Sequence, residues 1–63
     1  MQVITVYHVV PAPTGWAVHT VDGETAYADK STALRLGQEL ARASRGQLVI
    51  HRDDGTVQAE HSY

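Results

Sequence analysis

The fold is decided by the stretch QVITVYHVVPAPTGWAVHTV, residues 2–21. Residues 2–10 are almost all β-branched or aromatic, which favours a strand, and residues 11–15 follow with proline- and glycine-containing turn chemistry. Residues 16–21 are a second β-prone run, which the turn-forming pair Asp22-Gly23 closes. The sequence therefore predicts a β-hairpin at the start of the chain.

The first predicted strand carries apolar side chains on both of its faces. Successive side chains of a strand point to opposite sides, so one face receives the odd-numbered residues and the other the even-numbered ones. The two sets are Val3, Thr5, Tyr7 and Val9, and Ile4, Val6, His8 and Val10. Strands of this kind are usually covered on both faces. The sheet built on this strand is thus expected to need two covers.

Residues 29–45 predict one amphipathic helix. Asp29 is the candidate N-cap, with Ser31 as the alternative, and the helix is expected to end near Arg45. At about 100° per residue, one side of the helix collects small and apolar residues. They are Ala33, Leu36, Gly37, Leu40, Ala41 and Ser44. A glycine inside a helix costs about 1 kcal/mol relative to alanine, so Gly37 indicates that the helix lies close to the sheet there.

The chain ends in a second predicted hairpin. Residues 47–52 and 56–62 are β-prone runs on either side of the turn-forming residues 53–55. The sequence does not decide whether residues 24–28 extend the second strand or form a loop that leads to the helix. The predicted fold class is α+β: a single ββαββ domain over residues 1–63, with a four-stranded, mainly antiparallel sheet and one helix packed on one face.

Length and composition exclude several classes of protein. The chain has 63 residues, a formal net charge of −2 and no cysteine, so it holds neither a disulfide framework nor a cysteine-based zinc site. No apolar run approaches the roughly 20 residues of a membrane span, and the first residues lack the pattern of a signal peptide. The near-neutral charge gives no general reason to expect nucleic acid or a membrane as a partner. We therefore expect a cytoplasmic protein.

Several short motifs together point to a family. They are Tyr7-His8-Val9-Val10-Pro11, Gly15-Trp16-Ala17-Val18, Glu39-Leu40-Ala41, Leu48-Val49-Ile50-His51, Asp54-Gly55 and the terminal Tyr63. In order and spacing the sequence resembles the small bacterial family called domain of unknown function 2188. The resemblance spans nearly the whole chain and implies a compact ββαββ domain. It implies no catalytic residue.

The four histidines are the only unusual set of potentially functional side chains in this sequence. His8 and His51 belong to the two most apolar predicted strands, and their imidazoles can approach each other on one face if those strands are neighbours. A pair of neutral imidazoles can bind zinc, but the spacing matches no metal motif. We therefore expect structural histidines, hydrogen-bonded in or beside the core, and assign neither a metal nor a cofactor; zinc binding by His8 and His51 is the less favoured alternative. His19 and His61 are expected to face solvent.

No arrangement of residues predicts catalysis. The sequence has no nucleophile in a strained elbow and no glycine-rich phosphate loop, and a domain this small has little room for a substrate pocket. The chain is therefore not expected to be an enzyme, and no catalytic residues are assigned.

The expected function follows from the second, uncovered face of the sheet. A short chain gains stability by sharing its core, and symmetric pairs are the commonest oligomers, so we expect a homodimer or a protein-interaction module that acts through its sheet. The candidate interface residues are Tyr7, His8, Trp16 and His51. The alternative is a nucleic-acid-binding module that uses the sheet or the helix face bearing Arg35, Arg42 and Arg45.

Overall fold

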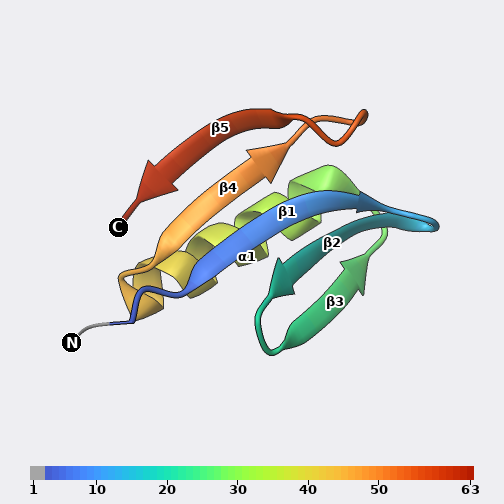
Figure 1. Cartoon of the computed structure of the whole chain (residues 1–63). Coiled ribbons are helices and arrows are strands. Elements are labelled where there is room, and N and C mark those ends of the chain that lie inside the picture. Colours follow the sequence, from blue (N-terminus) through green and yellow to red (C-terminus); the bar gives the residue numbers. More distant parts are fainter. Residues whose placement is uncertain (1–2) are drawn as a thin grey trace.

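A computed structural model, which describes residues 3–63, contains a five-stranded sheet with one helix on one of its faces (Figure 1). The elements are β1 (Val6–Ala12), β2 (Gly15–Thr20), β3 (Gly23–Tyr27), α1 (Lys30–Ser44), β4 (Gln47–His51) and β5 (Val57–Ser62). The strand order is β3-β2-β1-β4-β5, so β1 is the central strand. The predicted α+β class with a single helix is confirmed.

The sheet is mixed because of the path that α1 takes. β1, β2 and β3 form an antiparallel meander, and β4 and β5 form an antiparallel hairpin. After β3 the chain passes through α1 over β2 and β1 and re-enters the sheet beside β1, where β4 pairs with it in parallel (Figure 1). The helix therefore packs mainly on β1 and β2 and covers the middle of the sheet.

The prediction of four strands was wrong by one, because the undecided segment forms β3. Gly23, at φ 142°, lies opposite Thr20 and closes a two-residue turn that brings the chain back along β2. β3 is an edge strand whose residues are exposed except for the half-buried Tyr27. An edge strand does not need the apolar alternation by which a buried strand is recognised.

β1 differs in its bounds from the predicted strand. It begins at Val6 and continues through Pro11 to Ala12, while the predicted start at Gln2 lies outside the described residues. The proline is tolerated because β1 pairs with β4 only as far as Val9, so the missing N–H interrupts no bond to that strand. The turn that follows is correspondingly shorter than the predicted five-residue loop.

α1 begins and ends close to the predicted residues. The Asp29 side chain is the N-cap and accepts a hydrogen bond from the Thr32 backbone N–H at 2.8 Å. This bond, with another from the Ser31 hydroxyl, holds the pKa of the Asp29 carboxyl below its usual value. At the other end Arg45 adopts the left-handed conformation, and the Gly46 N–H donates to the Ala41 carbonyl at 2.8 Å.

Small residues form the seam between helix and sheet. Ala33, Gly37 and Ala41 are the buried residues of α1. A Cβ atom added to Gly37 would lie 3.1 Å from Leu48 Cδ1 and 3.2 Å from a Val9 methyl, so the predicted close approach is confirmed. Leu40, which was predicted on the same apolar side of the helix, is 45% exposed. The apolar side of α1 is therefore broader than the part of it that the sheet covers.

Candidate functional site

No helix formed by residues 3–63 covers the sheet face opposite α1, which we call the open face. Val9, Val18 and Leu48 pack under the helix, so the alternation along each strand places their neighbours on the other side. The open face includes Val6, His8 and Val10 of β1, Ala17 and His19 of β2, Glu24 and Ala26 of β3, Gln47, Val49 and His51 of β4, and Val57, Glu60 and Ser62 of β5. It combines an apolar centre with histidines and carboxylates.

Three histidines on adjacent strands lie close together on the open face. His8 Nδ1 is 3.1 Å from His51 Nε2, and the ring centroids are 5.3 Å apart. His19 faces His8 directly across the β1–β2 pair, with ring centroids 6.3 Å apart. The approach of His8 to His51 that the sequence predicts for neighbouring strands is therefore confirmed.

The hydrogen bonds of His51 determine which ring nitrogens carry protons. His51 Nδ1 lies 2.9 Å from the Gly55 carbonyl, which can only accept, so Nδ1 is the protonated nitrogen of a neutral His51. Its Nε2 then presents a lone pair, and His8 Nδ1 donates to it. The turn after β4 thus orients His51, and His51 in turn orients His8.

The surroundings of His8 oppose its protonation. Partial burial lowers the pKa of His8, and the neighbouring His51 and His19 rings lower it further through charge repulsion. On the far side of His19, its Nδ1 lies 3.9 Å from a Glu24 carboxylate oxygen, and both side chains are more than half exposed. Glu24, His19, His8 and His51 therefore form a row across the sheet, from a carboxylate at the β3 edge to a hydrogen-bonded imidazole pair at the centre.

An apolar hollow adjoins this row at one end of the open face. It has a volume of about 360 Å³, and its lining includes Val3, Ile4 and Val21 together with His8 and His19. Val3 and Val21 are 91% and 93% exposed, so they present bare apolar surface. The sequence analysis did not find this hollow, although a valine in the β2–β3 turn, where polar residues are usual, was a signal for it.

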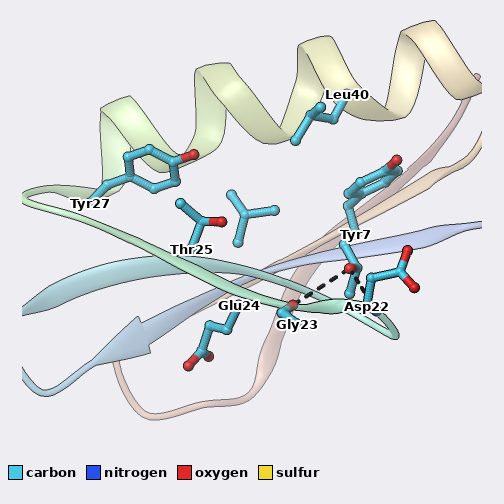
Figure 2. A pocket seen from close by; sticks show the side chains of 9 residues that line it. Tyr7, Asp22, Gly23, Glu24, Thr25, Tyr27 and Leu40 are labelled. Carbon is cyan, nitrogen blue, oxygen red and sulfur yellow. Dashed lines mark hydrogen bonds between the residues drawn. The ribbon is translucent and has the colours of Figure 1, made fainter.

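A second hollow lies on the helix side, between α1 and the β2–β3 hairpin (Figure 2). Its volume is about 410 Å³, and Tyr7, Tyr27, Thr25 and Leu40 point into it, whereas Glu24 points away from the helix. This hollow exists because α1 packs mainly on β1 and β2 and leaves edge strand β3 partly uncovered. It explains the exposure of Leu40.

The four candidate interface residues are divided between the two faces. Tyr7 and Trp16 pack against the core on the helix side, and the Lys30 ammonium lies 4.7 Å from the centre of the Trp16 ring. His8 and His51 lie together on the open face. Only this pair is therefore available to a partner on the open face.

The comparisons with known proteins agree with the resemblance. Residues 7–63 match the model of a family described as an uncharacterized protein conserved in bacteria, DUF2188. The chain belongs to this family. No curated protein and no solved structure matches this chain. The DUF2188 description names no activity, so function is argued from the site alone.

In this DUF2188 protein the basic residues avoid the sheet. Lys30, Arg35, Arg42, Arg45 and Arg52 all lie outside the strands. Arg35 is 3.8 Å from the Glu39 carboxylate, and Arg42 lies over the Tyr63 ring at 5.9 Å. Across residues 3–63 no group of three or more His, Asp or Glu side chains is close enough to hold a metal ion, and no helix is long and apolar enough to cross a membrane.

Proposed function

We propose that this DUF2188 protein is a non-catalytic interaction module that self-associates through its open face. The observation that carries the proposal is the apolar centre of a sheet face without helical cover. Val6, His8 and Val10 of the central strand are half-buried there, although no second layer of the described residues packs on them. Association would remove their remaining apolar surface from water.

The layout of the open face supports a protein interface. Interfaces have an apolar centre and a polar, solvated rim. Here the accessible centre is formed by Val6, His8 and Val10 of β1, which are half-buried between the buried Ala17 and Val49. His19, Glu24 and Glu60 lie nearer the edges of the sheet and are exposed. The described strands carry no Lys or Arg, so the open face offers nothing with which to neutralise phosphates. A second copy of the chain is the partner that this surface fits best.

The size of the open face limits the expected affinity. Five strands about 4.8 Å apart and about 20 Å long give roughly 500 Å² per copy, or about 1,000 Å² for a pair. Stable complexes bury about 1,200–2,000 Å² in total, so this pair falls in the range of weak, transient association. The exposed residues Val3, Ile4 and Val21 beside the face would add apolar area to the contact.

Sedimentation of the protein over a wide concentration range tests the proposal. We expect a reversible monomer–dimer equilibrium that changes little with salt, because apolar association is not screened. Val10→Glu places a charge at the centre of the open face and should leave a monomer. Ala43→Glu, on the exposed outer side of α1, adds the same charge and should leave the equilibrium unchanged.

Circular dichroism should show both variants folded, and Val6→Glu replaces Val10→Glu if that variant unfolds. A monomer at the highest concentration, or equal dimerisation of the Val10→Glu variant, would reject the proposal. A gel shift with an oligonucleotide, lost steeply as salt increases, would instead favour nucleic-acid binding.

A further inference from the structure

The hydrogen-bonded pair of His8 and His51 has chemistry that self-association does not use. The two imidazoles face each other through nitrogen atoms, and neutral imidazole is the commonest metal ligand among side chains. His8 lines the apolar hollow, and both rings of the pair are only half-buried, so an ion can reach them. Its geometry resembles that of a metal site in two respects.

The first respect is the way in which His51 is held. Histidines that bind metals almost always donate their other ring N–H to a carboxylate, a backbone carbonyl or water, which fixes the tautomer and the ring orientation. His51 does this through Nδ1, which donates to the Gly55 carbonyl at 2.9 Å. Its Nε2 lone pair is thereby oriented toward the space beside His8 before any ion is bound.

The second respect is the separation of the two nitrogens. Two Zn–N bonds of about 2.05 Å at a tetrahedral angle place the nitrogens about 3.4 Å apart. His8 Nδ1 and His51 Nε2 are 3.1 Å apart, so a shift of a few tenths of an ångström suffices. Among the described residues His51 is the only hydrogen-bond partner of the His8 ring, and that ring can therefore rotate until both lone pairs point at one ion.

We propose that His8 and His51 bind one ion of the imidazole-binding transition metals, Zn²⁺, Ni²⁺ or Cu²⁺, through His8 Nδ1 and His51 Nε2. On binding, the His8 proton leaves Nδ1 and a proton is taken up at Nε2, so the ring stays neutral and the protein gains no charge of its own. Water occupies the remaining positions, since the described residues offer no third ligand in place. The affinity is therefore expected to be lower than that of sites with three or four protein ligands.

The site does not rest on self-association, because both ligands come from one chain. Binding of the ion and the oligomeric state are measured separately, so either proposal can fail alone. If an ion is shared by two copies, the stoichiometry becomes one ion per two chains, which contradicts a site made within one chain.

Calorimetric titration of the metal-free protein with zinc chloride tests the inference. We expect one ion per chain and a rise in Tm with zinc, because an ion that binds only the folded chain stabilises it. In nitrogen-detected NMR spectra, the ring signals of His8 and His51 should move, and His8 should change from the Nδ1–H to the Nε2–H tautomer. The signals of His61 should stay in place.

Variants with matched chemistry complete the test. His8→Asn and His51→Gln should each weaken zinc binding by more than about tenfold, the scale of metal-site perturbations. His61→Gln removes an exposed histidine of β5 and should bind zinc like the unchanged protein. If His51→Gln unfolds because the Gly55 contact is lost, zinc binding by the His8→Asn variant and the tautomer of His8 in NMR spectra of the unchanged protein test the proposal instead. Equal zinc binding by the His8→Asn and His61→Gln variants, or an unchanged His8 tautomer, would overturn the proposal.

Discussion

The two faces of the sheet bury their apolar side chains by different means. On the helix face, the small residues Ala33, Gly37 and Ala41 let α1 approach closely, and Leu48 is fully buried against it. On the open face, Val49, the next residue of β4, is 6% exposed although no helix covers it. Val49 lies between His8 of β1 and Glu60 of β5, the residues that pair with it on the two neighbouring strands. The comparison shows that similar burial can rest on a rigid packed layer or only on adjacent side chains.

Alanine substitutions at these neighbouring residues should separate the two kinds of burial. Leu48→Ala leaves a cavity under a helix that has little freedom to move, and we expect a loss of about 2–5 kcal/mol in the free energy of unfolding. Val49→Ala opens a site that water and nearby side chains can fill, so the expected loss is about 1 kcal/mol. Urea denaturation of both variants measures the difference. Equal losses would show that the open face is packed as tightly as the helix face.

Replacing Gly37 by a larger residue tests the packing of the helix face by overfilling it, whereas Leu48→Ala leaves a cavity. Gly37→Val would press methyl groups against Leu48 and Val9, which a Cβ alone already approaches to 3.1 and 3.2 Å. Overpacking of this kind costs about 1–3 kcal/mol. Valine has a higher helix propensity than glycine, so the intrinsic effect of Gly37→Val is favourable by a few tenths of a kcal/mol; the difference in stability between the Ala43→Gly and Ala43→Val variants, on the exposed side of the same helix, measures it. A Gly37→Val variant as stable as the unchanged protein, or more stable, would mean that the helix does not need its close approach.

The contrast between faces also explains how far the sequence could predict this molecule. The helix, its Asp29 cap and the role of Gly37 follow from residue type and periodicity, and all three are confirmed. β3 was missed because an exposed edge strand lacks an apolar pattern. The exposure of Leu40 was missed because it depends on which strands the helix covers, and that is a property of the sheet order.

The candidate site was predictable only in part, for a related reason. Two histidines in apolar strands indicate that their rings meet if the strands are neighbours, and β1 and β4 are indeed adjacent. The tautomers depend on the contact of His51 with the Gly55 carbonyl, which joins a strand to the turn after it and leaves no trace in the pattern of residue types. The hollow beside His8 depends on where residues 3–5 lie, which periodicity does not determine.

The open face should also make the stability of the metal-free protein depend on pH. Burial, followed by the charges of His51 and His19, lowers the pKa of His8 below the 6.5 that an unperturbed histidine has. Below pH 6.5 the unfolded chain therefore binds a proton at His8 more readily than the folded chain does. The free energy of unfolding should fall as the pH decreases from 6.5, until the folded His8 is protonated as well. Above pH 6.5 His8 should contribute no pH dependence.

Urea denaturation in the presence of a chelator, between pH 5 and pH 8, measures this smallest of the expected effects. This range avoids Asp29 and Asp54, whose lowered pKa values make them stabilise the fold until the pH falls below about 3.8. His8→Gln removes the titrating group at the centre of the row and should flatten the pH profile, whereas His61→Gln should preserve it. The carboxylates that face the row are Glu24, beside His19, and Glu60, opposite Val49. An acid-induced loss of stability that persists in the His8→Gln variant would assign the effect to another group and remove the open-face row as its cause.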